Sequence, residues 1–236
     1  MFTPIQILKD KFGYQSFRFN QEEIINTILR QQDAFVLMPT GGGKSLCYQI
    51  PALIFPGLTV VISPLIALMK DQVDALRING IKASYLNSSL SSEESSEVYN
   101  ELKRGELKLL YIAPERLFNN NEQFMFFLKS LRVALFAIDE AHCISEWGHD
   151  FRPDYRNLSL LKKLFPQVPL IALTATATAK VREDIINQLN LQKAPLYITS
   201  FNRENLNLSI IEKKQAFPKL INLMQKYKGE SVIIYS

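Results

Sequence analysis

The sequence predicts an α/β fold in which an open, mostly parallel central sheet is flanked by helices on both faces. Short apolar or β-branched segments alternate along the chain with helical patterns, as parallel sheets require. Several of these segments are apolar at consecutive positions, which is expected for strands that are covered on both sides. A glycine-rich turn directly follows the first segment, at the strand end where such sheets bind ligands.

The elements follow one another in this order up to residue 200. Strands are expected at residues 34–37, 59–62, 83–86, 108–112, 133–138, 170–173 and 196–198. A helix is expected to start at Leu46, directly after the glycine-rich turn. Residues 91–94 (SSEE) have the pattern of a capping box, which predicts a helix that ends near Arg104. After Thr178 the apolar residues recur at helical spacing, so another helix is expected there.

The pattern changes after Pro195. Residues 201–205 are polar, and the chain then predicts a strand at 206–211, a helix at about 217–227 and a strand at 231–235. These elements are too few to bury a core by themselves. We therefore expect a first domain over residues 1–200, and a linker with the truncated beginning of a second domain over residues 201–236.

The composition is that of a globular protein with room for one large domain. The chain has 236 residues, with 27 Lys and Arg against 23 Asp and Glu, so its net charge is only +4. This balance is compatible with a nucleic-acid partner but does not argue for one, because a phosphate-binding face would have to be local. Cys47 and Cys143 are far apart, which excludes a disulfide framework or a cysteine-based zinc site and indicates a reducing compartment.

No stretch of the sequence predicts export or membrane insertion. The N-terminal residues lack the charged-then-apolar pattern of an export signal, so a cytoplasmic location is expected. Residues 52–69 contain no charged side chain, but Pro56-Gly57 and Ser63-Pro64 interrupt them. Such pairs break helices and mark turns, so we expect a helix end, a turn, a buried strand and a second turn there.

Residues 38–45 (MPTGGGKS) predict a loop that binds the phosphates of a nucleotide. A predicted strand precedes the loop and a helix follows it, so backbone N–H groups and the positive end of a helix dipole point at one place. Glycine is needed because the backbone must approach phosphate oxygens closely. Lys44 would reach the β- and γ-phosphates, and the Ser45 hydroxyl would complete the shell of a Mg²⁺ ion. The strict pattern has glycine where this chain has Met38, and the alternative is a glycine-rich turn that merely ends in Lys-Ser.

Residues 138–142 (IDEAH) place two adjacent carboxylates at the end of a predicted strand. Phosphoryl transfer to water needs a group that holds the metal ion and a group that orients the attacking water. Asp139 suits the first role through the Mg²⁺ shell, Glu140 suits the second, and His142 is placed to sense the γ-phosphate. The alternative is a solvated acidic strand end with a capping histidine.

Four segments, the first of which contains the glycine-rich loop, carry a resemblance to a known family. They are residues 39–49 (PTGGGKSLCYQ), 63–72 (SPLIALMKDQ), 113–117 (APERL) and 173–178 (LTATAT). Together with the acidic segment they resemble motifs of the first motor domain of superfamily 2 helicases, and within these the RecQ family of DNA helicases. The resemblance covers nearly the whole chain. It implies a RecA-like P-loop NTPase domain that uses ATP and Mg²⁺, followed by the start of a second RecA-like domain.

Residues 12–21 (FGYQSFRFNQ) are similar to the adenine-recognition motif of this family. The resemblance implies that Gln21 hydrogen-bonds the adenine edge, and that Tyr14 and Arg18 lie on or near the base. An amide suits adenine because it donates and accepts at once. The expected nucleotide-binding residues are then Tyr14, Arg18, Gln21, Thr40, Gly41, Gly42, Gly43, Lys44 and Ser45, with Ser45 and Asp139 on the metal ion.

Residues 12–21 differ from the adenine-recognition motif at one place and also allow another interpretation. The chain has Phe19-Asn20 where the family commonly has Pro-Gly, which affects the turn before Gln21. The alternative for the segment is the start of an amphipathic helix, with Phe12 and Phe17 in the core.

Residues 143–155 (CISEWGHDFRPDY) hold the only tryptophan of the chain, Trp147, among further aromatic and basic side chains. Single-stranded nucleic acid is held by cations on phosphates and by base stacking on aromatic rings, worth roughly 1–3 kcal/mol per base. In the family that the chain resembles, this aromatic-rich loop links DNA binding to ATP hydrolysis. The alternative is that Trp147 and Phe151 pack against the end of the sheet.

The resemblance also assigns a relay to the residues after the strand at 170–173. Thr174 and Thr176 would hydrogen-bond between the acidic segment and the DNA side; alone, they read as a turn that caps the next helix. The expected DNA-binding and coupling residues are Trp147, His149, Phe151, Arg152, Ser63, Thr174 and Thr176, with Lys70, Asn87 and Arg116 as weaker candidates.

The function implied by the resemblance is that of an ATP-dependent 3′-to-5′ DNA helicase, which acts on single-stranded and partially duplex DNA in repair and recombination. In a bacterium such a protein would lie in the cytoplasm at the nucleoid. No membrane partner is expected, and the sequence does not identify protein partners.

Two alternatives stay open. One is another superfamily 2 motor, such as a DEAH-type RNA helicase. The other is an ATP- and DNA-binding module without turnover. In this family the catalytic arginines come from the second domain, so the chain alone is expected to hydrolyse ATP weakly or not at all.

Overall fold

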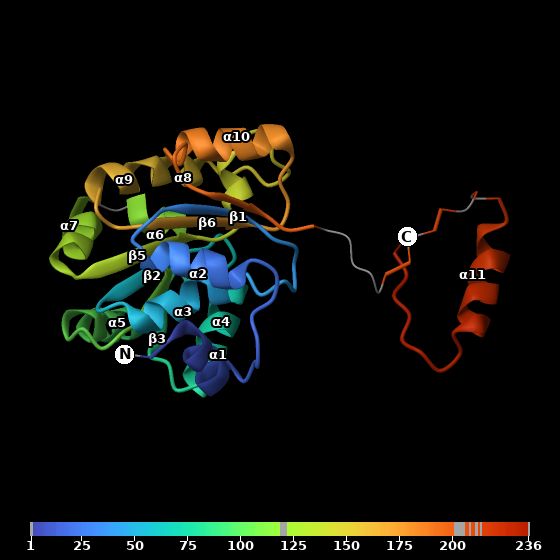
Figure 1. Cartoon of the computed structure of the whole chain (residues 1–236), viewed down its shortest axis with the longest axis horizontal. Coiled ribbons are helices and arrows are strands. Elements are labelled where there is room, and N and C mark those ends of the chain that lie inside the picture. Colours follow the sequence, from blue (N-terminus) through green and yellow to red (C-terminus); the bar gives the residue numbers. More distant parts are fainter. Residues whose placement is uncertain are drawn as a thin grey trace. The chain divides into compact units, whose positions relative to one another are not determined.

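Parallel strands form one sheet in the first part of the chain (Figure 1). This computed structural model describes residues 2–118, 122–200, 206–207, 209–210, 212 and 214–235. Within them the strand order is β3-β4-β2-β5-β6-β1-β7, and all paired strands are parallel. The strands are β1 Ala34–Leu37, β2 Leu58–Ile62, β3 Ala83–Leu86, β4 Leu109–Ile112, β5 Val133–Ile138, β6 Leu170–Thr174 and β7 Leu196–Ile198. Every strand predicted before residue 200 is confirmed.

The register of the sheet brings separate loops together at its carboxyl edge. Leu37 at the end of β1 lies beside Thr174 at the end of β6, and Ile62 of β2 lies beside Ile138 of β5. Since all the strands run the same way, the residues that follow β1, β2, β5 and β6 meet at one edge. The glycine-rich loop and the acidic segment therefore share a surface although they are far apart in sequence.

Helices cover both faces of the sheet, and the strands contribute alternate residues to each side. Ala34 and Val36 of β1 belong to the core under α2 (Gln21–Leu29), α3 (Leu46–Ile54) and α4 (Ile66–Ile78). Phe35 and Leu37 belong to the opposite core. That core lies under α5 Ser92–Lys103, α6 Pro114–Phe118, α7 Glu122–Ser130, α8 Pro153–Arg156, α9 Leu160–Leu164 and α10 Ala179–Gln188, with the short 3₁₀ helices η1 Ala141–Ile144 and η2 Asn157–Ser159. Figure 1 shows α9 and α10 on one side of β1 and β6, and α2 to α4 on the other.

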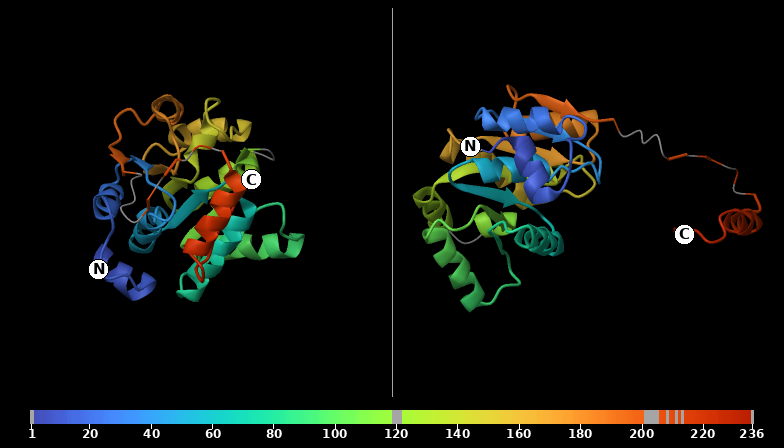
Figure 2. Two further views of the ribbon diagram at one scale, coloured as in Figure 1. Left: turned by 90° about the vertical axis from the view of Figure 1, so that its right-hand side faces the viewer. Right: turned by 60° about the horizontal axis from the view of Figure 1, so that its bottom comes forward.

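A third, smaller core lies under the first helix. Helix α1 (Pro4–Phe12) packs outside α2 and α3, through Ile7 and Leu8 against Ile25 and Ile50. Figure 2 shows α1 at the edge of this layer.

Two predicted helix starts are confirmed by their caps. Ser91 accepts a hydrogen bond from the N–H of Glu94, and the Glu94 carboxylate accepts one from the N–H of Ser91, at 3.1 and 2.8 Å. Thr178 caps α10 by accepting from the N–H of Val181 at 3.4 Å. Each cap satisfies N–H groups that the first turn of a helix leaves without a partner.

The uncharged stretch 52–69 folds as its turn signals predict. Helix α3 ends at Ile54, β2 is buried throughout, and α4 begins at Ile66. Among the described residues there is no helix with both the length and the apolar composition to cross a bilayer.

The chain divides into one compact unit up to Phe201 and a second from Asn202 onward. In the second unit, α11 (Ala216–Lys226) confirms the predicted helix. The predicted strand at 231–235 is wrong. Those residues are exposed and form no strand, because a strand needs a neighbour for its backbone N–H and C=O groups and no described segment supplies one.

The remaining predictions for this unit are only partly covered. The predicted linker at 201–205 lies outside the described residues, as do Leu208 and Ile211 of the predicted strand at 206–211. The described members of that segment form no strand. That the second unit begins a second RecA-like domain stays a prediction.

Candidate active site at the carboxyl edge of the sheet

The loop of residues 38–45 leaves β1 and enters α3, as its sequence predicts. Gly41 and Gly43 both have a φ of 77°, a left-handed conformation that residues with a Cβ disfavour. A Cβ at Gly43 would in addition collide with Nε2 of Gln21. The backbone conformation therefore favours glycine at both positions, and close packing in addition requires it at Gly43, as in loops that wrap a phosphate.

Met38 stands where the strict loop pattern has glycine, and the structure shows why this is tolerated. The side chain is fully buried and lies over Gly42, where an added Cβ would be 2.7 Å from Cγ of Met38. Nζ of Lys44 donates to the carbonyl of Met38 at 3.2 Å. The loop thus closes around the Lys44 ammonium, and Met38 supports it from the core side.

The adenine-motif residues lie against the same loop. The Gln21 amide is buried; it donates to the carbonyls of Gly42 and Gly43 at 3.2 and 3.0 Å and accepts from the N–H of Arg18 at 2.8 Å. The guanidinium carbon of Arg18 is 5.8 Å from the ring centroid of Tyr14. A pocket of about 60 Å³ is lined by Leu8, Tyr14, Ser16, Arg18, Gln21, Gly41, Gly43 and Leu46. The structure brings the predicted residues together, and their contact with adenine stays a prediction.

The neighbouring phenylalanines divide as the alternative interpretation expects. Phe12 and Phe17 are half-buried and pack against the core under α1. Phe19, where the family commonly has proline, is 60% exposed and has a φ of 49°. This conformation is strained for an aromatic residue, and it forms the turn that delivers Gln21 to the loop.

Asp139 directly follows β5, and its N–H donates to the carbonyl of Ile62 at 2.8 Å. Burial raises the pKa of its carboxyl to about 6 and the adjacent Glu140 adds to this, while the Lys44 ammonium lowers it. A divalent cation would relieve both the burial of this charge and its repulsion by Glu140. Ser45, the other predicted metal ligand, begins α3 without using its hydroxyl as an N-cap. These two residues fit a Mg²⁺ ion.

Glu140 has a φ of 48°, an unusual conformation for a residue with a side chain. Its Oε2 lies 3.2 Å from Nδ1 of His142, and this hydrogen bond holds the pKa of the Glu140 carboxyl below its usual value. Nδ1 of His142 also lies 2.9 Å from Oγ1 of Thr174, which itself donates to the carbonyl of Thr176 at 3.2 Å. Both neighbours of Nδ1 accept, so the ring carries its proton on that nitrogen.

The aromatic-rich segment 143–155 is tied to two other loops. The His149 ring stacks on the His142 ring with centroids 4.6 Å apart. Arg152 donates to the carbonyl of Pro64, after β2, at 2.9 Å. The segment is therefore fixed both to the acidic residues and to the segment 63–72.

Trp147 is 63% exposed, so the alternative that it packs as a core residue is wrong. Phe151 is half-buried, with the guanidinium carbon of Arg156 5.4 Å from its ring centroid. The two aromatic residues thus occupy different environments, and Trp147 is the one available for stacking.

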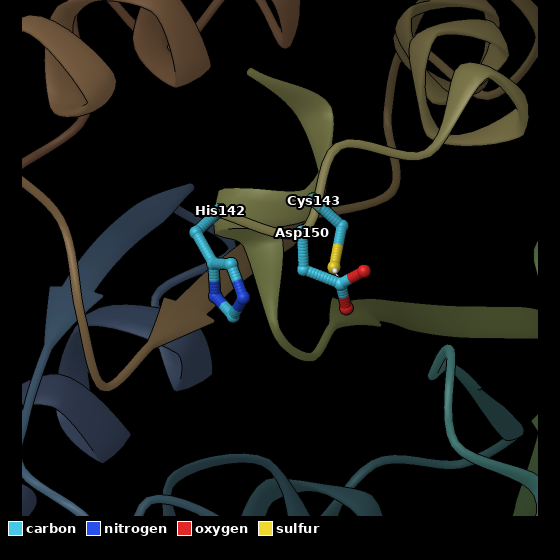
Figure 3. A group of neighbouring side chains, drawn as sticks. All are labelled: His142, Cys143 and Asp150. Carbon is cyan, nitrogen blue, oxygen red and sulfur yellow. Dashed lines mark hydrogen bonds between the residues drawn. The ribbon is translucent and has the colours of Figure 1, made fainter. Parts of the chain in front are cut away.

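Three side chains in this region have the chemistry of metal ligands (Figure 3). Ligand atoms of His142, Cys143 and Asp150 lie within 4.8 Å of one another. Each group has a protein partner: Cys143 donates to Asp150 at 3.6 Å, Asp150 pairs with Arg152 at 3.3 Å, and His142 bonds Thr174. Burial raises the pKa of the Cys143 thiol to about 12, which keeps the sulfur protonated. The cluster is satisfied by hydrogen bonds alone.

The other predicted DNA contacts differ in how accessible they are. Thr176 and Lys70 are exposed and Arg116 is half-buried, whereas Ser63, Asn87 and Thr174 are buried. The N–H of Ser63 donates to the carbonyl of Ile112 at 3.2 Å. A role in DNA binding stays a prediction for all of them.

Two further features were not expected from the sequence. Leu65, Ile66 and Leu68 are 37%, 40% and 45% exposed beside Pro64, although an apolar run normally indicates core. Nζ of Lys180 lies 3.0 Å from the ring centroid of Trp147. The only signal for Lys180 in the sequence is its place just after the Thr178 cap.

The chain is similar to known helicases. The profile of the DEAD/DEAH box helicase family matches residues 18–185. The ATP-dependent DNA helicase RecQ of Haemophilus influenzae is 53% identical over 233 residues, which are 99% of this chain and 37% of that protein. RecQ of Bacillus subtilis is 49% identical over 98% of this chain and 39% of that protein. The RecQ-like DNA helicase BLM of Xenopus laevis is 45% identical over 98% of this chain and 18% of that protein.

Solved structures show the same fold at low identity. The DUF1998 helicase MrfA matches with a TM-score of 0.70 at 17% identity, over 98% of this chain and 38% of that chain. The Hef helicase domain of Pyrococcus furiosus matches with a TM-score of 0.61 at 21% identity, over 84% of this chain and 40% of that chain. The predicted RecA-like helicase fold is confirmed.

The chain spans 37% and 39% of the length of the two bacterial RecQ proteins that it matches. Within that span the family profile covers both the glycine-rich loop and the acidic segment, and the similarity to RecQ proteins extends over nearly the whole chain. The chain belongs to the DEAD/DEAH box helicase family, and within it to the RecQ group.

Proposed function

We propose that this domain binds ATP with Mg²⁺, and that the full-length protein couples ATP hydrolysis to 3′-to-5′ movement on single-stranded DNA and to the opening of duplexes. The similar RecQ proteins are named ATP-dependent DNA helicases, and this supports the proposal. Single-stranded and partially duplex DNA are the proposed substrates, with a role in repair and recombination. A cytoplasmic, nucleoid-associated location stays a prediction.

One observation carries the nucleotide half of the proposal. The register of the sheet brings the loop after β1 and the acidic segment after β5 to one edge, and there the Lys44 ammonium lowers the pKa of both Asp139 and Glu140. A phosphate chain held by the loop would therefore extend toward two carboxylates with different pKa shifts, one raised and one lowered. Sites that hydrolyse phosphoanhydrides need this pairing of a cation with a metal-binding acid and a water-orienting acid.

Each residue then takes a distinct part. Lys44 binds the β- and γ-phosphates, while Ser45 and Asp139 would hold Mg²⁺, which neutralises charge on the phosphates when it is bound. Glu140 orients the attacking water, since its depressed pKa keeps it ionised at neutral pH. His142 holds the Glu140 carboxylate and links it to Thr174. Gln21, Tyr14 and Arg18 recognise the base.

The charges around the two carboxylates suggest that this chain alone turns over slowly. Among the described residues, the positive charges with the largest effect on the pKa of these two carboxyls come from Lys44 and His142, and at Glu140 also from His149; none of these main contributions comes from an arginine. In related motors an arginine that reaches the transition state is worth about 10³–10⁵ in rate. We therefore propose that the chain binds MgATP and that full turnover needs positive charge supplied from elsewhere.

The DNA half rests on the aromatic-rich segment. Its exposed Trp147 lies on the same segment as His149, which stacks on His142. A base stacked on Trp147 would act on a segment that directly contacts the hydrolytic residues. Arg152 ties that segment to Pro64, beside the exposed Leu65 and Ile66.

The test is an ATPase and strand-separation assay of the full-length protein with single-stranded DNA, single-stranded RNA or no nucleic acid. Stimulation by DNA and unwinding of a duplex with a 3′ tail are expected. Stimulation by RNA alone would instead support a DEAH-type RNA helicase. Binding of MgATP without hydrolysis under any condition would support a binding module.

A further inference from the structure

Lys180 and Trp147 form a close contact between two segments that the active site also joins. Nζ of Lys180 lies 3.0 Å from the centroid of the Trp147 ring. Lys180 is the second residue of α10, directly after the turn 174–178, and Trp147 is in the aromatic-rich segment. An ammonium over an indole face is attracted by the negative face of the ring, and tryptophan is the strongest partner for it.

The residues directly before these two segments also meet, at a buried place. His142, in the 3₁₀ helix η1 directly after Glu140, bonds Thr174 at 2.9 Å, and both side chains are buried. Trp147 and Lys180 are both exposed. The connection between the acidic segment and the turn before α10 therefore has an inner contact beside Glu140 and an outer contact at the surface where Trp147 is accessible.

Lys180 contacts the Trp147 ring although two carboxylates follow it on its own helix at the spacing of helical ion pairs. Glu183 and Asp184 lie three and four residues further on, the spacing at which helical ion pairs form. In the described part of the chain neither forms an ion pair with Lys180. Glu146, next to Trp147, pairs instead with Arg156 at 3.1 Å. The Lys180 contact is thus made specifically with the indole.

We propose that Lys180 is a positioning residue that couples the place of Trp147 to helix α10, and through the turn 174–178 to the hydrolytic residues. The inference rests on the proposed function, since it names how DNA at Trp147 reaches Glu140. A nucleobase that stacks on the covered indole face must displace the Lys180 ammonium. The displaced ammonium can then pair with a phosphate of the same DNA strand, which shifts the start of α10 toward the DNA. The shift passes through the turn 174–178 to Thr174, and from Thr174 to His142 through their hydrogen bond.

The first experiment tests the contact itself and needs no activity. Trp147 is the only tryptophan of the chain, so fluorescence quenching by acrylamide reads its accessibility directly, and acrylamide is neutral and insensitive to the lost charge. In Lys180→Ala the indole should become more accessible, so acrylamide should quench its fluorescence more strongly than in wild type. The expected increase is at most about 2- to 5-fold, which corresponds to the strength of an exposed cation–π contact. Lys180→Arg should restore the wild-type value, because arginine also stacks on indole. Lys163→Ala, an exposed lysine on α9, is the matched control and should change nothing.

The second experiment tests the coupling in the full-length protein, at saturating single-stranded DNA so that a change in DNA affinity does not enter. Lys180→Ala should lower the DNA-stimulated ATPase rate about 2- to 5-fold while the rate without DNA stays at the wild-type value, and Lys180→Arg should keep most of the stimulation.

The outcomes separate the proposal from the function on which it rests. Equal quenching of wild type and Lys180→Ala would overturn the contact, and changed quenching with unchanged stimulation would overturn the coupling. If the wild-type protein showed no DNA-stimulated ATPase at all, the proposed function would fail, and the coupling with it. The quenching comparison would still decide whether Lys180 positions Trp147.

Discussion

Nδ1 of His142 lies 2.9 Å from Oγ1 of Thr174, across 32 positions of sequence. The contact joins the loop after β5 to the end of β6, and both groups are buried. The same ring nitrogen lies 3.2 Å from the Glu140 carboxylate. The group proposed to orient the attacking water is therefore connected, through one imidazole, to the turn that begins α10.

The substitution Thr174→Val keeps the shape of the side chain and removes the hydroxyl that His142 contacts. MgADP binding should be preserved, whereas DNA-stimulated ATPase of the full-length protein should fall, because the link from Glu140 to the α10 turn is broken. The free energy of unfolding should drop by about 1 kcal/mol, the usual net worth of a buried hydrogen bond. Calorimetry, ATPase assays and thermal melts check the three parts.

The matched control is Thr59→Val. Thr59 is equally buried, but its hydroxyl has no hydrogen-bond partner. Removal of an unsatisfied hydroxyl should leave stability equal or higher, with no effect on ATPase. Equal loss of stability in both variants, with equal ATPase, would contradict the role of the Thr174 hydroxyl.

Gly43→Ala tests the shape of the phosphate-binding loop. The added Cβ meets both a positive φ of 77° and the Gln21 amide, so nucleotide affinity should fall and the melting temperature should drop. The control is Gly80→Ala. Gly80 has a φ of 69° and open space around it, so an added Cβ there strains the backbone without colliding with another group. If both variants lost the same stability and neither lost nucleotide affinity, the close approach of Gln21 to the loop would have no functional meaning.

Glu140→Gln separates binding from hydrolysis. An amide cannot take up charge from the attacking water as a carboxylate does, so turnover of the full-length protein should stop while MgATP binding stays near wild type. Filter binding of labelled ATP and a phosphate-release assay measure the two. A parallel loss of binding would give Glu140 a structural role at its strained backbone position instead.

Trp147→Ala should reduce DNA-stimulated ATPase far more than the basal rate. Because Trp147 is 63% exposed, the melting temperature of the Trp147→Ala variant should stay near that of wild type. Phe151→Ala should reduce stimulation as well, but with a loss of stability, since that ring is half-buried. Parallel loss of both rates and of stability in Trp147→Ala would show that the indole is structural.

The two cysteines give a prediction for pH. Burial raises the pKa of both the Cys47 and the Cys143 thiol to about 12 from a usual value of 9.0. Neither should react with a maleimide at pH 8 until urea unfolds the protein. The unfolded state releases these protons first, so stability should fall as the pH rises from about 9 toward 12. Fast alkylation of either cysteine in the native protein would contradict the burial of that side chain.

Much of the fold follows from local chemistry. The strands were predictable because residues such as those of β1 and β5 are apolar on consecutive positions, which only a doubly covered sheet accommodates. The caps at Ser91 and Thr178 were predictable because they depend on neighbours within the same turn. The strand prediction for residues 231–235 is wrong because a high β propensity does not supply the partner strand that a strand needs.

The candidate site also has parts that the sequence predicts and parts that it does not. The glycine-rich loop could be predicted because its glycines are required by the backbone itself. The contacts of Arg152 with Pro64 and of Lys180 with Trp147 could not, because 88 and 33 positions of sequence separate their members and only the folded sheet brings them together. These contacts between loops thus depend on how the folded sheet places the loops that follow its strands.

The central claim is that residues 38–45 and the acidic segment form a nucleotide site in this chain, and titration calorimetry with MgADP tests it most directly. The wild-type chain should bind one equivalent, and Lys44→Ala should bind about 10- to 100-fold more weakly with an unchanged melting temperature, as expected for the loss of charge-assisted bonds to phosphate. Lys163→Ala should bind like wild type. Equal affinity of wild type and Lys44→Ala for MgADP would contradict the account.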